Sequence, residues 1–90
     1  MKIKLYGSKH WPGCPGVKEA LLQNNVEFDY VEITDSMKNL KEFLKIRDNS
    51  DDFNIVRRVH AVGIPMILID GKVHLNITDE LIDEISKGHL

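Results

Sequence analysis

The stretch that decides the fold is residues 2–14, KIKLYGSKHWPGC. Ile3 and Leu5 alternate with lysines at its start, which is the period-two pattern of a half-buried strand. Glycine and proline interrupt the loop from Ser8 to Gly16, and an apolar pattern with helical spacing follows. We therefore predict a strand, a loop, and a helix whose start presents the residues from Trp11 to Cys14.

The next segments are predicted to complete a β-α-β unit. Val17, Ala20 and Leu21 recur at helical spacing, and the pair Asn24-Asn25 ends that helix. A second strand follows, in which Val26, Phe28 and Tyr30 alternate with acidic residues. Two strands joined by one helix form a right-handed parallel unit, and such sheets bind ligands at the carboxyl ends of their strands. We therefore expect any chemistry in the loop from Ser8 to Gly16.

The middle of the chain is predicted to be helical with one break. Ser36 can cap a helix whose apolar positions recur every three to four residues, at Met37, Leu40, Phe43 and Leu44. This helix is expected to end near Asn49, and Ser50 then opens a shorter helical segment. The apolar positions of the shorter segment are Phe53, Val56 and Val59.

A hairpin and a last helix are predicted for the C-terminal third. The apolar run Met66 to Ile69 is followed by the turn pair Asp70-Gly71 and a return strand over Lys72 to Leu75. Thr78 is expected to cap the last helix, and Gly88 to end it. The inward positions of that helix are Leu81, Ile82 and Ile85.

The summed order is β-α-β-α-α-β-β-α. It predicts an α/β fold with a four-stranded mixed sheet flanked by helices. A length of 90 residues predicts one domain over residues 1–90.

Composition narrows the classes of partner. Apolar residues make up 42% of the chain and the net charge is -2, so no basic field favours nucleic acid. No apolar run approaches the length of a membrane span or of a signal peptide, so we expect a cytoplasmic protein without membrane contact. Cys14 is the one cysteine, which excludes an internal disulfide.

Two motifs far apart in the chain resemble the glutaredoxin family. Residues 6–14 read YGSKHWPGC, which resembles the strand, Tyr-Gly-Ser-Lys and Cys-Pro-x-Cys of small bacterial glutaredoxin-related proteins. Gly63-Ile64-Pro65 is similar to the cis-proline element of the family and predicts a cis Ile64–Pro65 bond. Asp70-Gly71 is similar to its terminal hairpin. The resemblance implies a thioredoxin-like fold, thiol–disulfide exchange and glutathione as a co-substrate, with no bound cofactor.

The alignment of the motif decides which residue of this chain occupies the position of the first cysteine. The distances along the chain to Tyr6 and Val26 put Trp11 in the position of the first cysteine, which is the attacking thiol in this family. Cys14 is then the only redox thiol left and a weak nucleophile, since it stands in the poorly accessible second position. The other register reads Cys14-Pro15 as a monothiol site and shortens the first helix by about one turn. Cys14 is equally well explained as a small core residue without chemistry.

Six further residues are candidates for binding. The resemblance implies that Ile64 offers backbone groups to a glutathione peptide next to Pro65. Asp79 is a candidate partner for a ligand amine, and Lys9 for a carboxylate, although a helix-start acid and a solvated lysine explain both residues more simply. Pro12 and Gly13 complete the loop. Asn76 and Ile77 stand where the family has paired glycines, so that contact is not expected to transfer.

Three functional interpretations remain open from the sequence. The chain is a glutaredoxin-related thiol–disulfide oxidoreductase with at most one-cysteine chemistry, or a non-catalytic module that binds a peptide, glutathione or a protein partner. In the third, Trp11 replaces a cysteine through a single codon change. Histidines are too scattered to form a metal site with Cys14, and the Trp11 register argues against an iron–sulfur cluster. The sequence predicts no oligomeric state.

Overall fold

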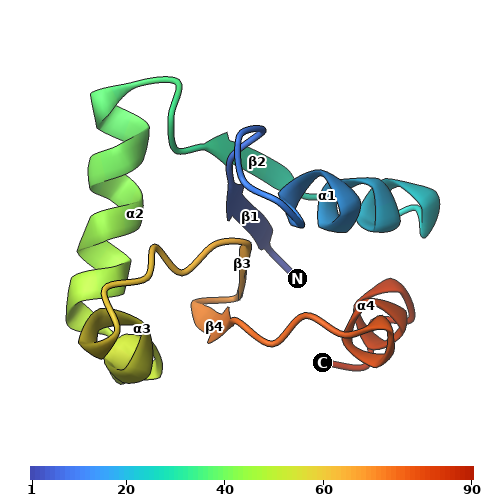
Figure 1. Ribbon diagram of the computed structural model, residues 1–90. Coiled ribbons are helices and arrows are strands. Elements are labelled where there is room, and N and C mark those ends of the chain that lie inside the picture. Colours follow the sequence, from blue (N-terminus) through green and yellow to red (C-terminus); the bar gives the residue numbers. More distant parts are fainter.

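The fold is described from a computed structural model that covers all 90 residues. Four strands form one mixed sheet, in the spatial order β2-β1-β3-β4 (Figure 1). Their bounds are Ile3–Gly7 for β1, Asp29–Glu32 for β2, Met66–Ile69 for β3 and Lys72–His74 for β4. Strand β1 runs parallel to β2 and antiparallel to β3, which in turn pairs antiparallel with β4. The predicted mixed sheet is confirmed.

Helices cover both faces of the sheet. Helices α1 and α4 lie on one side of it, and α2 and α3 lie on the other (Figure 1). Their bounds are Cys14–Gln23 for α1, Met37–Asn49 for α2, Asn54–Arg58 for α3 and Asp79–Ser86 for α4, with a 3-10 turn at Asp51–Phe53. The predicted order of elements is confirmed, and the break after Asn49 lies where it was expected.

Each face of the sheet has its own apolar cluster. Leu5 of β1 packs with Leu21 of α1 and Ile82 of α4 on one face. Tyr6, the next residue of β1, packs with Phe43 of α2 on the other face. Successive side chains of a strand point to opposite faces, so β1 contributes to both clusters.

Local signals in the sequence set the ends of the elements. Ser36 Oγ accepts a hydrogen bond from the Asn39 N–H at 3.1 Å, and Thr78 Oγ1 accepts one from the Leu81 N–H at 3.1 Å. Asp70 and Gly71 both have positive φ, 48° and 87°, as a tight hairpin turn requires. These predicted caps and the predicted turn are confirmed.

The second strand begins later in the chain than the alternation predicts. It covers Asp29–Glu32 instead of the residues from Val26 to Tyr30. Asn25 has φ 58°, and the Val26 N–H donates to the Leu21 carbonyl at 3.1 Å, so Val26 still belongs to the turn that ends α1. Its side chain packs against the core without joining the ladder, which explains the misleading alternation.

Two residues of the apolar patterns in the middle of the chain are exposed. Met37 is 69% exposed and Val59 is 61% exposed. Met37 is the first residue of α2 and Val59 follows the last residue of α3, so both lie at the ends of their helices. Strand β4 also stops at His74, one residue before the predicted end.

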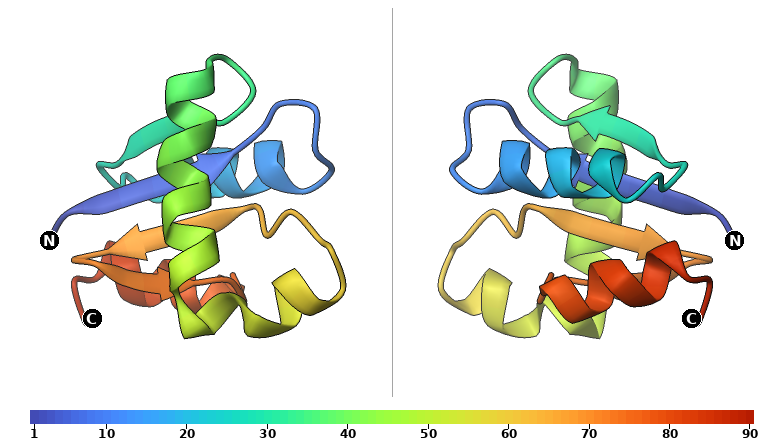
Figure 2. Two further views of the ribbon diagram at one scale, coloured as in Figure 1. Left: turned by 90° about the vertical axis from the view of Figure 1, so that its left-hand side faces the viewer. Right: turned by 90° about the vertical axis from the view of Figure 1, so that its right-hand side faces the viewer.

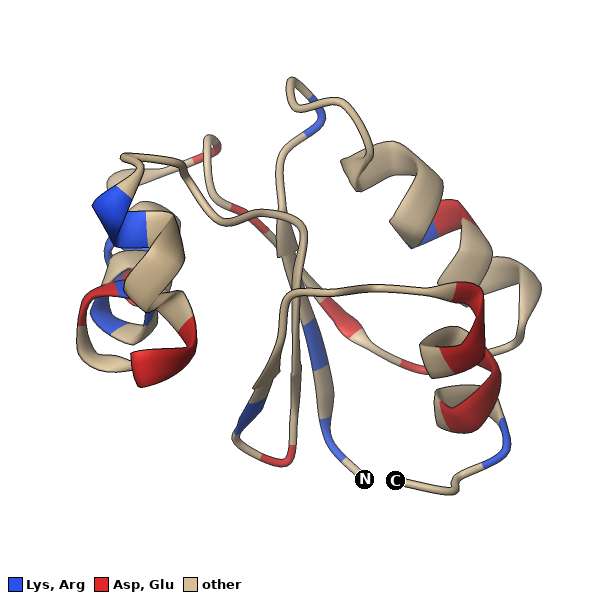
Figure 3. Cartoon of the chain, turned by 60° about the horizontal axis from the view of Figure 1, so that its bottom comes forward, with Lys and Arg blue, Asp and Glu red and all other residues tan.

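Two of the connecting segments lie at the end of the sheet opposite the chain ends. The loop after β1 and the segment before β3 lie at one end, and both termini lie at the other (Figure 2). Acidic residues line α4 near the C-terminus (Figure 3). None of the helices has the length and apolarity that crossing a bilayer would require.

Candidate functional site

The loop of residues 8–13 turns the chain from β1 into α1. The Trp11 N–H donates to the Ser8 carbonyl at 3.1 Å, and the Cys14 N–H donates to the Trp11 carbonyl at 3.3 Å. Gly13 precedes the helix with φ 93°, a conformation that costs glycine little. Pro15 stands in the first turn of α1, where a backbone donor has no partner to lose. As a result α1 begins at Cys14.

Cys14 is buried at this helix start. Its residue is 1% exposed, in the same apolar cluster as Tyr6 and Ile64. A Cβ atom at Gly7 would lie 3.2 Å from Cys14 Sγ, so the thiol packs directly against the backbone of β1. Burial raises the pKa of the Cys14 thiol; a backbone hydrogen bond at Ser8 opposes that rise, and the negative charge of Glu32 adds to it. Such a thiol is a poor nucleophile.

Trp11 has the opposite environment. It is 43% exposed at the tip of the loop, and its neighbours Pro12 and Gly13 are exposed as well. Lys9 is also exposed, and its Nζ lies 4.0 Å from Asp35 Oδ1. An ion pair this long between two solvated side chains contributes little to stability.

The segment before β3 presents backbone groups at the same end of the sheet. The Ile64–Pro65 peptide bond is cis, and the Ile64 side chain is buried in the cluster that holds Cys14. Neither the N–H nor the C=O of Ile64 makes a hydrogen bond within the chain. Buried backbone groups normally have hydrogen-bond partners. The N–H and the C=O of Ile64 are therefore free to form hydrogen bonds with the backbone of an extended ligand.

Arg47 of α2 holds this segment in place. Its Nε donates to the Val62 carbonyl at 2.9 Å and its Nη2 donates to the Ala61 carbonyl at 2.6 Å. Gly63 has φ 94°, and a Cβ there would lie 2.8 Å from the Phe53 ring. Glycine is therefore required at this bend, and the arginine fixes the two carbonyls that precede it.

Glu32 is a buried carboxylate at the end of β2. It is 7% exposed and accepts hydrogen bonds from the Lys9 N–H at 2.7 Å, the Tyr30 hydroxyl at 2.9 Å and Thr34 Oγ1 at 2.6 Å. Burial by itself raises the pKa of this carboxyl, but the hydrogen bonds from Thr34, Lys9, Tyr30 and Ser8 outweigh it and lower the pKa to about 2. The group is therefore ionised at neutral pH.

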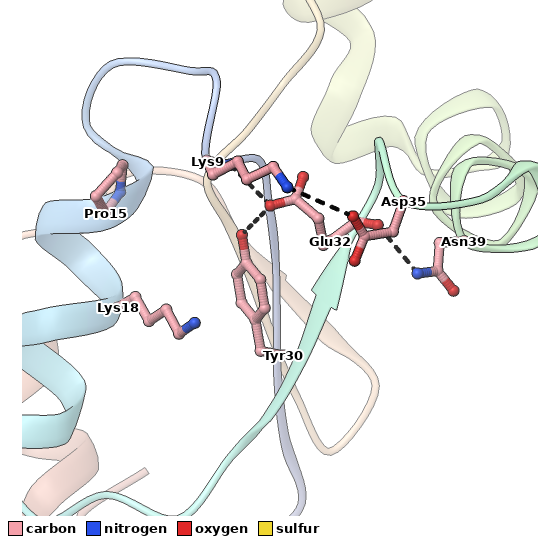
Figure 4. Close-up of a pocket in the computed structure, with 7 residues that line it drawn as sticks. All are labelled: Lys9, Pro15, Lys18, Tyr30, Glu32, Asp35 and Asn39. Atoms are coloured by element: carbon pink, nitrogen blue, oxygen red, sulfur yellow. Dashed lines mark hydrogen bonds and ion pairs between the residues drawn. The ribbon is translucent and has the colours of Figure 1, made fainter.

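A cavity of about 450 Å³ opens beside this carboxylate (Figure 4). Lys18 of α1 crosses it, with its Nζ 4.3 Å from the centre of the Tyr30 ring. The cavity is lined by Lys9, Pro15, Lys18, Tyr30, Glu32, Asp35 and Asn39. Of the residues proposed from the sequence only Lys9 lines it, so this cavity and the Ile64 backbone are separate features.

The structure brings the loop with Trp11, the buried Cys14 and the segment with Ile64 together (Figure 2). The loop with Trp11 and the segment with Ile64 lie at one end of the sheet, and Cys14 is buried together with Ile64. Asp79 is exposed in the first turn of α4 and its side chain makes no hydrogen bond or ion pair in the chain. No group of three or more His, Cys, Asp or Glu side chains converges on one point.

Sequence reasoning missed Glu32 and Arg47. The alternation of Val26, Phe28 and Tyr30 continues to Glu32, so the inward face of the strand was a usable signal for the carboxylate. No local pattern marks Arg47, because its partners are the carbonyls of Ala61 and Val62, 14 and 15 residues further along the chain.

Comparison with known proteins agrees with this architecture. The chain is 29% identical over 83 residues to an uncharacterized glutaredoxin-like 8.6 kDa protein in the rubredoxin operon of Clostridium pasteurianum, covering 92% of this chain and 95% of that one. It is 39% identical over 54 residues to an uncharacterized protein of Haemophilus influenzae, covering 59% of this chain and 63% of that relative.

Two solved structures share the fold. A mutant of a thioredoxin-like protein aligns with a TM-score of 0.67 at 23% identity, over 96% of this chain and 95% of that one. A glutaredoxin from Archaeoglobus fulgidus aligns with a TM-score of 0.67 at 20% identity, over 93% of this chain and 84% of that one. The glutaredoxin family model matches residues 3–74. Since that match takes in most of the chain, this protein belongs to the glutaredoxin family.

Proposed function

We propose that this protein is a binding domain of the glutaredoxin family that takes an extended thiol peptide, with glutathione as the simplest ligand. The observation that carries the proposal is the unpaired backbone of Ile64 beside the cis Pro65. A peptide that lies antiparallel to this segment gains two main-chain hydrogen bonds without displacing an internal one. Arg47 keeps those backbone groups in position. Lys9 is exposed in the loop at the same end of the sheet (Figure 2), and we assign to it the contact with a ligand carboxylate.

The environments of the two motif residues support binding in place of thiol–disulfide exchange. A family thiol that attacks must be exposed and easily ionised, whereas Cys14 is 1% exposed and its pKa is raised. Trp11 is 43% exposed. It stands in the position of the attacking cysteine when the motif is aligned so that Cys14 is the second cysteine. An indole there offers a flat apolar surface to a bound peptide and performs no thiol chemistry.

Titration with S-methylglutathione tests this function, because that ligand cannot form a disulfide. We expect its addition to shift the amide NMR signals of Ile64 and Trp11, with the same affinity in wild type and Cys14→Ala. Lys9→Gln should weaken binding several-fold, while Lys41→Gln, the same charge change on the exposed surface of α2, should not. The proposal is wrong if the Ile64 amide does not respond to millimolar ligand.

A second arm of the experiment asks whether Trp11 stands in the position of the attacking cysteine. Trp11→Cys recreates Cys-Pro-Gly-Cys, and we expect this variant to reduce a glutathionylated peptide while wild type does not. Trp11→Ser is the matched control. A folded but inert Trp11→Cys variant would contradict the assignment of Trp11 to the first-cysteine position without affecting the binding measurement.

A further inference from the structure

The proposed binding function makes no use of the buried charge of Glu32. Its carboxylate connects three segments: the loop through the Lys9 N–H, β2 through the Tyr30 hydroxyl, and the following turn through Thr34 Oγ1. Thr34 Oγ1 also lies 3.2 Å from Ser8 Oγ, so the turn is joined to the loop a second time. A buried ion with this many donors has a position that the surrounding structure determines closely.

Cys14 lies against the same part of the sheet. Gly7 pairs with Glu32 in the register of β1 and β2. A Cβ at Gly7 would lie 3.2 Å from Cys14 Sγ and 3.7 Å from Cε1 of Tyr30, so the thiol and the tyrosine ring meet over this glycine. The hydroxyl of the same ring donates to Glu32. Glu32 therefore holds both the loop that precedes Cys14 and the ring beside its sulfur.

We propose that Glu32 is a positioning residue that keeps Cys14 unreactive, by tying the loop of residues 8–13 down over the thiol and by placing a negative charge on the same side. The tie limits access of any disulfide to Sγ. The charge opposes formation of a thiolate. This inference concerns the state of Cys14 and does not depend on which ligand the Ile64 segment binds.

The other charges near the thiol do not cancel this effect. Lys9 Nζ lies toward Asp35, and Lys18 Nζ lies over the Tyr30 ring. The Tyr30 hydroxyl is neutral, because burial and its hydrogen bond to Glu32 raise its pKa. The pKa of Glu32 is about 2, so its charge is present throughout the pH range in which a thiol titrates.

The test is the rate at which Cys14 reacts with a small aromatic disulfide, measured against pH. In this reaction the Cys14 thiol gives its proton to solvent and its thiolate attacks one reagent sulfur. The Sγ–S bond forms, the reagent S–S bond breaks, and an aryl thiolate leaves with the electron pair. The midpoint of the profile reports the pKa of the thiol, and the plateau at high pH reports access.

Glu32→Gln keeps the length of the side chain and removes its charge, and Glu32→Asp keeps the charge and withdraws the carboxylate from Lys9. We expect Glu32→Gln to lower the midpoint. For each unit of lowering, the rate at pH 7 should rise about threefold, since a tenfold gain in thiolate is partly offset by lower nucleophilicity. Glu32→Asp should keep the midpoint and raise the plateau. The control is Glu27→Gln, which removes an exposed carboxylate and should change neither.

Two results would overturn the proposal. An unchanged midpoint in Glu32→Gln refutes the proposed effect of the charge on the thiol. An unchanged plateau in Glu32→Asp refutes the proposed effect of the loop on access to the thiol. If Glu32→Gln does not fold, as judged by circular dichroism, Thr34→Val takes its place beside Glu32→Asp. Both keep the charge and weaken the tie, so both must react faster than wild type, and equal rates refute the inference.

Discussion

Acid should destabilise this protein in a way that depends on Glu32. The carboxyl has a pKa of about 2 in the folded chain, against 4.5 for an unperturbed glutamate. Because the pKa is lowered by folding, the stabilisation is fully present above pH 4.5 and is lost as the pH falls from there toward 2. Lowering the pH from 7 to 3 should therefore remove about 2 kcal/mol of the free energy of unfolding through this one group.

Glu32→Gln isolates this contribution, since every other carboxyl group is unchanged. We would measure urea unfolding of wild type and variant at pH 7 and pH 3, by far-UV circular dichroism and by the fluorescence of Trp11, the one tryptophan. The stability advantage of wild type over the variant should shrink by about 2 kcal/mol between the two pH values. Glu27→Gln, with its exposed side chain, should show no such change.

One result would refute the reasoning. If the difference between wild type and Glu32→Gln is the same at both pH values, within about 0.5 kcal/mol, the carboxyl does not have a low pKa in the folded chain. The hydrogen bonds from Lys9, Tyr30 and Thr34 would then not be formed as described.

Two further predictions concern packing and the segment before β3. Gly7→Ala should cost about 1–3 kcal/mol in urea unfolding, because the added methyl meets Cys14 Sγ, and part of that cost should disappear in a Cys14→Ala background; additive effects would contradict this contact. Arg47→Met should cost about 2 kcal/mol or more and speed amide hydrogen exchange before β3, because two loop carbonyls lose a charged donor. The exposed Arg58→Met should change stability by less than about 0.5 kcal/mol, and an equal effect of both variants would refute the assigned role of Arg47.

Much of the architecture could be predicted because its signals are local. Ser36 and Thr78 act on backbone groups three residues away, and the Asp70-Gly71 turn needs only the conformational freedom of its own two residues. The predicted second strand failed for the same reason, since Val26 fits the alternation but its N–H is taken by Leu21 of the preceding helix. Periodicity reports which side chains face the core, not which backbones pair.

The sequence by itself determined the kinds of element, their order and the family to which the motifs point. Only the tertiary structure decided that Cys14 is buried while Trp11 is exposed, although the two residues are three positions apart. It also decided that Glu32 reaches the loop at Lys9 and that Arg47 reaches the carbonyls before the cis proline. The physical reason is that burial and hydrogen bonding at these positions depend on residues brought together from distant parts of the chain, and no local pattern encodes those distances.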